Sequence, residues 1–413
     1  MSRPRPDVVY VQPGVPRVYE IVNAIVESGY SCHYLSGYYY REDGLPERFL
    51  RLLPRRWTNG LFATMKRRHL AYLPPEIVER SWMAEILLGI ERKFHFILPN
   101  FIMARSRYFD LRGALRVLML RPKIVIGCDS AALYTLRAAK KVGAVAILDQ
   151  VIGHVDAGNK ILSEEKLLHP EIGSAFQPTV ARMVRRCIKE VQEADYVFVP
   201  SDYVRESIIP FGVDPARIFM MPYGVNLTQF SPTPEIPVPP FKILFAGHIG
   251  MRKGVLYLLE AVRQANNPDI QVILLGNIEG DGEWLRDYED LFTHVHHLPH
   301  QEIPTVFADA HIYVYPSLHE GSTVSIYEAM ASGLPVVTTP NAGSVIRDGV
   351  DGFVVPVRDV DATRERIEKL YRDPVLRAAM AKSTAERAAD YSWHAYARRV
   401  GEALTSVLKD RSS

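Results

Sequence analysis

Short apolar stretches that alternate with helix-forming stretches most constrain the fold of this chain. In the first half they include "DVVYVQPG", "SCHYLSG", "RPKIVIGCDS", "GAVAILDQ" and "ADYVFVPS", and they are separated by sequences such as "SAALYTLRAAKKVG". Apolar runs of this length that are bounded by turn residues are typical of buried strands. Because strands that alternate with helices favour a parallel sheet covered on both faces, the sequence predicts a doubly wound α/β domain.

The same alternation restarts after a proline-rich stretch, residues 221–241, which is typical of an interdomain linker. Beyond it come the apolar stretches "KILFAGHIG", "IQVILLGN", "VHHLPH", "AHIYVYPS", "LPVVTTP" and "GFVVPV". We therefore expect an N-terminal domain over residues 1–220 and a C-terminal domain over residues 242–389. The N-terminal domain would contain a basic helical insert at about 41–123 and would be joined by a final amphipathic helix over about 390–413.

Composition restricts the classes of function. The 413 residues carry a net charge of +2, which argues against nucleic-acid binding as the main role. Cys32, Cys128 and Cys187 are widely spaced and odd in number, so they indicate neither a zinc site nor a disulfide framework. No stretch is apolar and long enough for a signal peptide or a membrane span. These features predict a soluble, cytoplasmic protein.

The predicted insert has an excess of positive charge. From Arg41 to Lys123 there are 17 Lys and Arg residues against 8 Asp and Glu residues, a net charge of +9. The basic residues alternate with Leu, Phe, Trp and Tyr, as in "RFLRLLPRRW". Two interpretations are open: a solvated helical insert, or a surface that lies against anionic lipid at the inner face of the membrane or against an anionic acceptor.

A glycine-rich turn follows the first strand of the C-terminal domain, in "AGHIGMRKGVLYLLEAV". Gly247 and Gly250 allow a tight turn, and Arg252 and Lys253 come just before a helix that begins near Gly254. Backbone amides, a helix N-terminus and two cations together favour a phosphate group. The alternative is an ordinary strand–helix loop with two solvated cations, since the pattern of a Walker loop is missing.

A second helix start in that domain, "HEGSTVSIYEAMASGLP", carries two carboxylates. Glu320 precedes the helix and Glu328 lies within it. One interpretation is a capping box, in which Ser325 begins the helix and Glu328 only satisfies backbone donors. In the other, both glutamates accept hydrogen bonds from sugar hydroxyls, and the amides at the helix start donate to phosphate oxygens. The second interpretation predicts a nucleotide sugar as the ligand.

The two glutamates and the following "AMASGLPVVTTPNAGSVIRDGVDGFVV" resemble the donor site of retaining glycosyltransferases of family 4, which have the GT-B fold. The likeness extends to "VPSDYVRESIIPFGVDPARIFMMPYGVNLTQFSP", "AGHIGMRKGVLYLLEA" and "YSWHAYARRV", and it covers roughly residues 195–400. The resemblance implies two doubly wound domains that face each other across a deep cleft, with the C-terminal helix packed back toward the N-terminal domain.

The resemblance also implies a role for each matching residue. Glu328 would bind the ribose hydroxyls, and Glu320 would bind hydroxyls of the transferred sugar. Lys253 and Arg252 would neutralise the phosphate charge that grows as the sugar leaves. The other implied donor-site residues are Gly14 and Gly247 in the two glycine loops, Leu298 beside the base, and the backbone amides of Ser322, Thr323 and Val324 beside the diphosphate.

Histidines add two candidates. His154 follows the strand "AVAILDQ", where related enzymes place a histidine that faces the transferred sugar, and a structural or solvated loop histidine is the alternative. His169 is a second candidate, and the other histidines, including His294, His296 and His297, are interpreted as surface residues. The family often has arginine directly after the glycine of the anion loop, where this chain has His248. Arg252 is therefore expected to take over part of the phosphate contact.

Together these features predict a metal-independent enzyme without a cofactor. It would transfer a hexose from a nucleotide sugar, UDP- or GDP-linked, to a hydroxyl of a glycan or lipid-linked acceptor, with retention of anomeric configuration. Helix N-termini and the pair Arg252 and Lys253 would replace a metal. Open alternatives are a sugar-nucleotide epimerase or a phosphorylase of the same fold, and a catalytically silent nucleotide-sugar-binding subunit.

Overall fold

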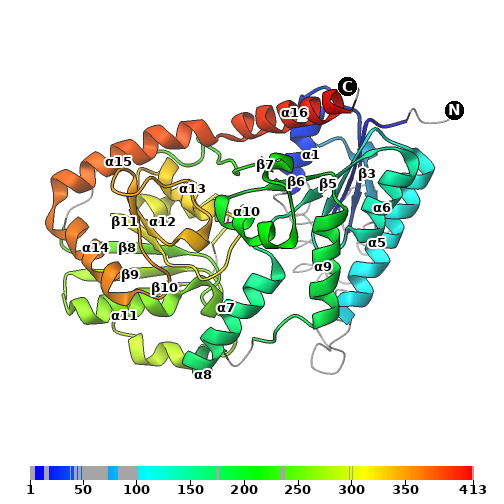
Figure 1. The fold of residues 1–413 in the computed structure, drawn as a ribbon. Coiled ribbons are helices and arrows are strands. Elements are labelled where there is room, and N and C mark those ends of the chain that lie inside the picture. Colours follow the sequence, from blue (N-terminus) through cyan, green and yellow to red (C-terminus); the bar gives the residue numbers. More distant parts are fainter. Residues whose placement is uncertain are drawn as a thin grey trace.

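Two α/β domains lie side by side in the computed structural model of the chain (Figure 1). Each domain is built on one sheet, and all strand pairings between the named strands are parallel. This architecture confirms the predicted fold class. The structure describes residues 5–13, 18–37, 39–40, 44, 48, 73–81, 101–173, 176–232, 238–296, 298–299 and 301–411.

The N-terminal sheet has seven strands in the order β3-β2-β1-β4-β5-β6-β7. Its strands are β1 (Val8–Val11), β2 (Cys32–Ser36), β3 (Val78–Arg80), β4 (Ile124–Cys128), β5 (Val145–Asp149), β6 (Tyr196–Val199) and β7 (Ile218–Met220). Strand β3 lies inside the segment 41–123 that the sequence predicts as a helical insert, so that prediction is wrong at this point. Only Val78 of its three residues is buried, so this stretch lacks the apolar run by which the other strands were recognised.

Helices cover both faces of this sheet. Val8 and Tyr10 of β1 pack with α1 and α16, whereas Val9 and Val11 pack with α5, α6 and α9, because successive side chains of a strand point to opposite faces. Burial on both faces explains why the central strands β1, β4, β5 and β6 are mostly apolar. The helices of this domain are α1 (Val18–Glu27), α5 (Phe101–Leu120), α6 (Leu133–Val142), α7 (Val155–Leu168), α8 (Pro170–Gly173), α9 (Ala181–Glu193), α10 (Asp202–Ile208) and α16 (Trp393–Asp410).

The C-terminal sheet has six strands in the order β10-β9-β8-β11-β12-β13. Its strands are β8 (Phe241–Ala246), β9 (Ile270–Leu275), β10 (Phe292–Val295), β11 (Ile312–Tyr315), β12 (Val336–Thr338) and β13 (Gly352–Val354). Helix α11 packs beside α14, and α13 packs beside α15. The helices of this domain are α11 (Val255–Ala265), α12 (Ile303–Ala308), α13 (Val324–Ala331), α14 (Val360–Arg372) and α15 (Pro374–Ala388).

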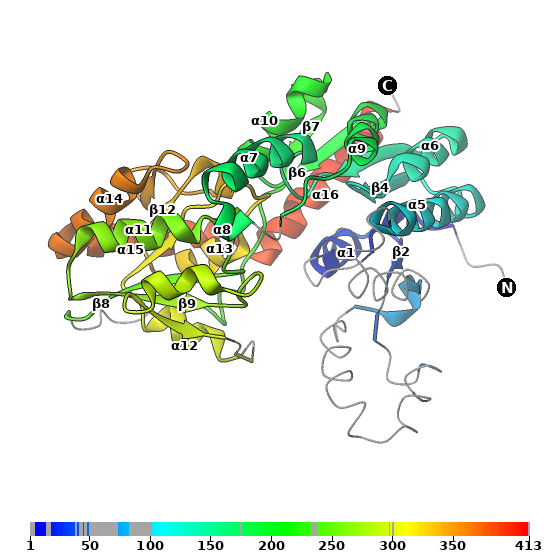
Figure 2. The ribbon, with the colours of Figure 1, turned by 90° about the horizontal axis from the view of Figure 1, so that it is seen from below.

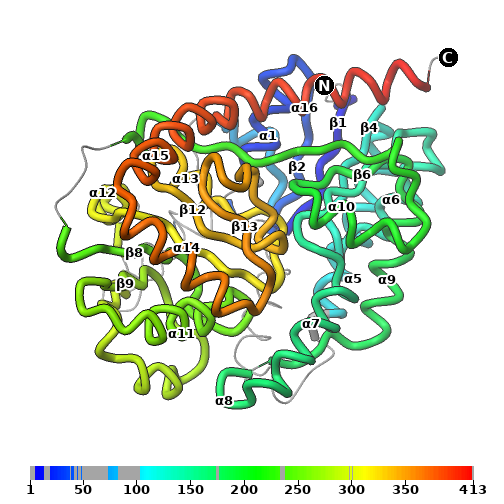
Figure 3. The backbone as a smooth tube through the Cα atoms, turned by 60° about the vertical axis from the view of Figure 1, so that its left-hand side comes forward, coloured from blue at the N-terminus to red at the C-terminus, as the bar shows by residue number. Residues whose placement is uncertain are grey.

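The end of the chain returns to the N-terminal domain. Helices α15 and α16 run in succession along one side of both domains, in orange to red (Figure 3). Tyr396, Val400 and Leu404 of α16 are buried against the N-terminal sheet beside α1. The predicted packing of the C-terminal helix is therefore confirmed. No helix among the described residues combines the length and the apolar character that a membrane span requires.

Helix α7 belongs to the N-terminal domain in sequence but packs against the other domain. Figure 2 shows α7 and α8 between the two sheets. Leu162 of α7 forms a small apolar cluster with Met251, Tyr257 and Leu318 of the C-terminal domain. The two domains are therefore joined by buried contacts close to the loop that contains Met251.

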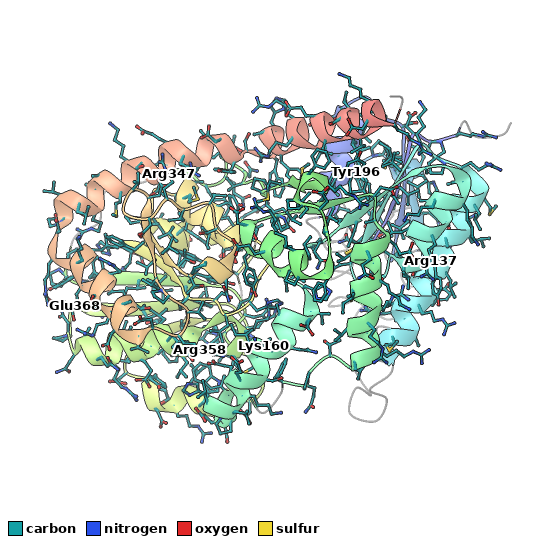
Figure 4. All side chains as sticks on the ribbon, in the orientation of Figure 1. Arg137, Lys160, Tyr196, Arg347, Arg358 and Glu368 are labelled. Atoms are coloured by element: carbon teal, nitrogen blue, oxygen red, sulfur yellow. The ribbon has the colours of Figure 1, made fainter. Side chains whose placement is uncertain are left out.

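A buried carboxylate reinforces this contact. Glu165 of α7 accepts hydrogen bonds from the Tyr257 hydroxyl and from Arg358 Nε, both at 2.7 Å. Arg358 also donates to the Ile161 carbonyl oxygen at 2.8 Å, and Figure 4 shows Arg358 near Lys160 of α7. Because Glu165 is buried and carries two hydrogen bonds from the opposite domain, α7 is held firmly against the C-terminal domain.

Candidate active site

A cavity of about 350 Å³ lies at the carboxyl edge of the C-terminal sheet. Its walls come from the segments that follow β8, β9, β10 and β11 and from the start of α13. In doubly wound sheets, ligands bind at this edge. The structure brings seven of the predicted site residues together in the lining: Gly247, Lys253, Leu298, Glu320, Thr323, Val324 and Glu328.

The loop after β8 forms one wall. Residues Met251–Lys253 make a single 3-10 turn, and Gly254 then adopts a left-handed conformation (φ 68°) directly before α11. A Cβ atom on Gly254 would collide with the Pro316 carbonyl oxygen, so only glycine fits here. This tight turn brings Arg252 and Lys253 beside the segment that contains Glu320.

Glu320 forms ion pairs with both Arg252 and Lys253. Arg252 Nη1 donates to Glu320 Oε1 at 2.5 Å, and Lys253 forms an ion pair with the same carboxylate oxygen. The side chains of Lys253 and Glu320 are only 12% and 11% exposed, so water screens their attraction weakly. Lys253 Nζ also lies 5.4 Å from the centre of the Tyr315 ring. The trio has a net positive charge, which can attract a ligand phosphate.

Helix α13 forms the opposite wall and begins at Val324, with Thr323 as its N-cap. The Thr323 hydroxyl does not cap the helix but donates to the Ala342 carbonyl oxygen at 3.3 Å. The first amides of a helix have no acceptor within the helix, and they give its start a partial positive charge. The start of α13 is therefore suited to an anion in the cavity.

The capping-box interpretation of this helix is wrong. Ser325 lies inside α13, where its hydroxyl donates to the Ala246 carbonyl oxygen at 3.0 Å and accepts from the Tyr313 hydroxyl at 2.6 Å. These two bonds tie the helix start to the end of β8 and to β11. Glu328 lies one turn further along α13 and faces the cavity.

Two other predicted residues do not line the cavity. The Ser322 hydroxyl is buried and shares a hydrogen bond of 2.9 Å with the Tyr327 hydroxyl. Arg252 contacts the site through Glu320 and through the His319 carbonyl oxygen, to which it donates at 3.0 Å. Their predicted roles at the diphosphate stay predictions.

The loop after β9 contributes residues that were not predicted, among them Gly276 and Asn277. Gly247 and Gly276 both have positive φ values, 155° and 140°, and a Cβ atom on Gly276 would collide with the Gly247 carbonyl oxygen. The two loops therefore pack backbone against backbone at the cavity. Gly276 and Asn277 could have been identified from the sequence, because they directly follow the strand "IQVILL" and ligands bind at the carboxyl ends of parallel strands.

The structure revises the assignment of the histidines in "THVHHLPH". His294 is half-buried and shares a hydrogen bond of 2.8 Å with the Gly276 carbonyl oxygen, so its assignment to the surface is wrong. His296 is exposed but lines the cavity, as does His248. His169 lies at the end of α7, 3.4 Å from Glu171, and does not line the cavity.

His154 is completely buried at the start of α7. Its Nδ1 accepts a hydrogen bond from the Asp156 amide at 3.2 Å, and its ring centre lies 4.2 Å from that of Phe211. Burial lowers the pKa of the imidazole to about 4. His154 caps α7 in this structure and does not line the cavity. Its predicted contact with the transferred sugar stays a prediction.

His319 is buried where the two domains meet, so its assignment to the surface is wrong. Its Nδ1 shares a hydrogen bond of 2.6 Å with the Tyr203 hydroxyl of the N-terminal domain. A Cβ atom on Gly158 of α7 would lie 2.7 Å from His319 Nε2. Burial, followed by the charge of Arg252, lowers the pKa of His319 to about 4. The imidazole is therefore neutral at pH 7.

The N-terminal domain also reaches the site through its backbone. The Gly153 amide donates to the Glu320 carbonyl oxygen at 3.0 Å. A Cβ atom on Gly321 would collide with the Val151 carbonyl oxygen, so the absence of a side chain allows this close approach. The loop after β5 thus lies directly against the segment that carries Glu320.

Some predictions concern residues outside the described part of the chain. These are Gly14, His297 and most of the basic segment, namely residues 41–43, 45–47, 49–72 and 82–100.

Among the described residues, no three His, Cys, Asp or Glu side chains are gathered as a metal site would require. The tripeptide Asp359–Asp361 has the Asp-x-Asp pattern of a metal-binding motif. Asp359 caps α14 by accepting from the Ala362 amide at 2.8 Å, and Asp361 lies 3.2 Å from Arg364. Both carboxylates thus have structural partners away from the cavity.

The fold and the cavity define a two-domain protein of the GT-B type. The family described as Glycosyltransferase Family 4 matches residues 15–229, and the family described as Glycosyl transferases group 1 matches residues 240–373. The chain belongs to glycosyltransferase family 4.

Individual relatives agree with this membership. The chain is 25% identical over 289 residues to WcaL of Salmonella typhimurium, named as a colanic acid biosynthesis glycosyltransferase, covering 65% of this chain and 68% of WcaL. It is 31% identical over 225 residues to the D-inositol 3-phosphate glycosyltransferase of Mycobacterium avium, covering 49% of this chain and 53% of that protein. The chain thus spans about half the length of the second relative.

Solved structures share the fold over nearly the whole chain. HepE of Anabaena, solved with UDP and glucose, has a TM-score of 0.63 at 15% identity and covers 97% of this chain and 99% of HepE. Sucrose-phosphate synthase of Thermosynechococcus elongatus has a TM-score of 0.64 at 18% identity, covering 98% of this chain and 99% of the synthase. At these identities the likeness shows the fold alone.

Proposed function

We propose that this protein transfers a hexose from a nucleotide diphosphate sugar to a hydroxyl of a glycan or lipid-linked acceptor, with retention of anomeric configuration. The observation that carries the proposal is the arrangement of the cavity. Lys253, which shares Glu320 with Arg252, faces the start of α13 across a site of about 350 Å³, and Glu320 and Glu328 line this site. A ligand with hydroxyls at both ends and phosphates between them matches this distribution of charge.

The known proteins support this donor and acceptor chemistry. HepE was solved with UDP and glucose, which is a precedent for a UDP-linked donor on this fold. WcaL is named for colanic acid biosynthesis, and the Mycobacterium avium relative is named for D-inositol 3-phosphate. We propose UDP or GDP as the nucleotide of the donor and a role in the synthesis of polysaccharides or other envelope glycans.

Binding would rearrange the charges of the site. The diphosphate would take the place of Glu320 beside Arg252 and Lys253, and Glu320 would then accept hydrogen bonds from the transferred sugar. Glu328, on the second turn of α13, would bind the ribose. As the bond to the sugar breaks, the two cations and the helix start would stabilise the charge on the leaving phosphate without a metal.

Retention and the location of the enzyme are further parts of the proposal. The leaving phosphate would accept the proton of the acceptor hydroxyl on the same face of the sugar, so that no second carboxylate is needed as a nucleophile. The enzyme would work in the cytoplasm, with the basic segment 41–123 against the anionic inner face of the membrane.

The test is an assay of nucleoside diphosphate release. The full chain is incubated with UDP-, GDP-, ADP- and dTDP-linked hexoses, with and without an extract of envelope lipids and glycans, and in the presence of EDTA. Release that depends on the extract, persists in EDTA and yields a product with the donor's anomeric configuration by NMR would support the proposal. An isomerised sugar formed without an acceptor would indicate an epimerase. Release that consumes inorganic phosphate would indicate a phosphorylase, and donor binding without turnover would indicate a silent subunit.

A further inference from the structure

A second cavity, of about 550 Å³, lies on the N-terminal domain between α5, α6 and α9. Five cationic side chains line it, together with the ring of Tyr134. They are Arg107, Arg182, Arg185, Arg186 and Lys189, and we call this site the arginine cavity. None of these residues belongs to the site described above.

Arg186 is the buried base of the arginine cavity. It forms ion pairs with Asp110 and Glu190, which are both fully buried. These two carboxylates also accept hydrogen bonds from amides at the start of α6, Asp110 from Tyr134 at 2.8 Å and Glu190 from Ala132 at 3.0 Å. Asp110 and Glu190 are therefore paired with Arg186 and with backbone amides, and they form no ion pair with the other four cations of the cavity.

The remaining four cations are exposed and converge on one space. Within the described part of the chain, Arg182, Arg185 and Lys189 form no ion pair and no side-chain hydrogen bond. The centre of the Tyr134 ring lies 6.0 Å from Arg107 Cζ and 5.4 Å from Arg186 Cζ. Like charges held together in this way repel one another unless an anion lies between them.

The arginine cavity lies at the edge of the sheet that faces the candidate active site. Helix α6 begins directly after β4, so its start is at the carboxyl edge of the N-terminal sheet. The loop after the neighbouring strand β5 emerges from the same edge and contacts the segment that carries Glu320. A molecule that reaches the active site from the N-terminal domain can therefore contact the arginine cavity as well.

We propose that the arginine cavity binds a phosphate or diphosphate group carried by the acceptor. This assignment of the anion to the acceptor rests on the proposed function. Guanidinium groups donate paired hydrogen bonds to phosphate oxygens, and several of them can surround a diphosphate. Phosphate held at this site would orient the acceptor while its reacting hydroxyl lies at the donor.

Two sources could supply such a group: a soluble phosphorylated acceptor or the head group of a lipid. Helix α5 carries Arg107 at the cavity and, along the same face, the exposed side chains of Leu111 and Leu115, which are 49% and 56% exposed. An apolar stripe that continues from a cationic site is typical of helices that lie on a lipid surface. The experiment therefore includes both sources.

The first arm measures the binding of pyrophosphate to the full chain by equilibrium dialysis. A saturating amount of the nucleoside diphosphate that the release assay identifies is present to occupy the donor site. Wild-type protein should bind about one equivalent. The double variant Arg182→Gln/Arg185→Gln should bind about tenfold more weakly or worse, because two cations near the anion are lost. The matched control, Arg286→Gln/Arg372→Gln, removes two exposed arginines of the C-terminal domain and should bind like wild type.

The second arm measures co-sedimentation with phosphatidylglycerol and phosphatidylcholine vesicles. If the protein sediments with the anionic vesicles and pyrophosphate prevents this, the site binds a lipid head group. If the protein binds pyrophosphate but does not sediment with vesicles, the site binds a soluble acceptor. Equal pyrophosphate binding by the wild type and the cavity variant, or no binding at all, would overturn the inference. Absence of binding of all four nucleoside diphosphates by the wild type would instead count against the proposed donor site, so the two failures can be told apart.

Discussion

At the scale of single residues, Lys253 is held more tightly than its place in a loop suggests. Its ammonium group forms an ion pair with Glu320 and lies over the face of the Tyr315 ring, and its side chain is mostly buried. These contacts fix a positive charge at the cavity. Such a preorganised charge contributes to catalysis because the protein need not reorient it as the reaction proceeds.

Lys253→Ala should lower turnover by about 100-fold, because one preorganised charge at the leaving phosphate is lost. The variant should remain folded, since Arg252 still pairs with Glu320. Steady-state kinetics with the donor identified by the release assay give the comparison. Lys242→Ala removes a partly exposed lysine of the same domain that pairs with Asp309, and it should leave turnover unchanged. Near-normal turnover of the Lys253 variant would contradict the assigned role.

Glu328→Gln tests the ribose contact. The structure shows that α13 begins at Val324 without a capping box, so the carboxylate is not needed to start the helix. We expect an unchanged melting temperature and a KM for the donor that is raised about tenfold, as expected for the loss of a charged hydrogen-bond acceptor. Glu365→Gln, on the exposed side of α14, is the control. An unchanged KM would remove Glu328 from the donor site.

The two carboxylates and the two cations could be predicted from the sequence because each pair lies within one short local segment. Glu320 and Glu328 frame one helix start, and Arg252 and Lys253 precede another. His319 was missed because its partner Tyr203 is 116 residues away, and no local pattern signals a contact of that kind.

At the scale of elements, helix α7 couples the two domains. Its sequence gave no sign of this role, because an amphipathic helix shows which face is buried but not which domain buries it. Glu165 is an example. A glutamate in a charged stretch is usually solvated, but Glu165 is buried and bound by Tyr257 and Arg358 of the other domain.

Tyr257→Phe should destabilise the protein by about 1.5–3 kcal/mol, the usual cost of losing a hydrogen bond to a charged group. The loss should be seen as a lower free energy of unfolding in urea. Tyr30→Phe removes an exposed hydrogen bond of 3.0 Å between two neutral hydroxyls, of Tyr30 and Thr405, and as the control it should cost about 1 kcal/mol or less. If Tyr257→Phe costs nothing, α7 is not held as the structure shows.

The interface at His319 should be sensitive to acid. Its pKa is about 4 in the folded protein and about 6.5 in an unfolded chain. The folded state therefore binds fewer protons, so the stability from the neutral ring is complete above pH 6.5 and is lost as the pH falls toward 4. The urea midpoint of His319→Gln should fall less between pH 7 and pH 4.5 than that of wild type. An equal fall in both would contradict this, and His394→Gln, at an exposed position of α16, should behave like wild type.

At the scale of the whole molecule, the two-domain plan was predictable from the alternation of apolar and helical stretches. Both sheets bury their strands on two faces, and such strands are apolar enough to be recognised. Strand β3 was not recognised, because Val78 is the only buried residue of its three. The contact between the domains could not be predicted from the sequence either. It depends on residues that are far apart in the chain, such as Val151 and Gly321.

The central claim is that the cavity between the glycine loops and α13 binds a nucleotide sugar. Calorimetric titration of the full chain with UDP, GDP, ADP and dTDP tests it most directly. We predict that one of these nucleotides binds with a stoichiometry of one. The variant Lys253→Ala/Glu328→Gln should bind it about 100-fold more weakly, because a cation and a carboxylate acceptor are lost together. No binding of any of the four, or equal binding by wild type and the variant, would contradict the account.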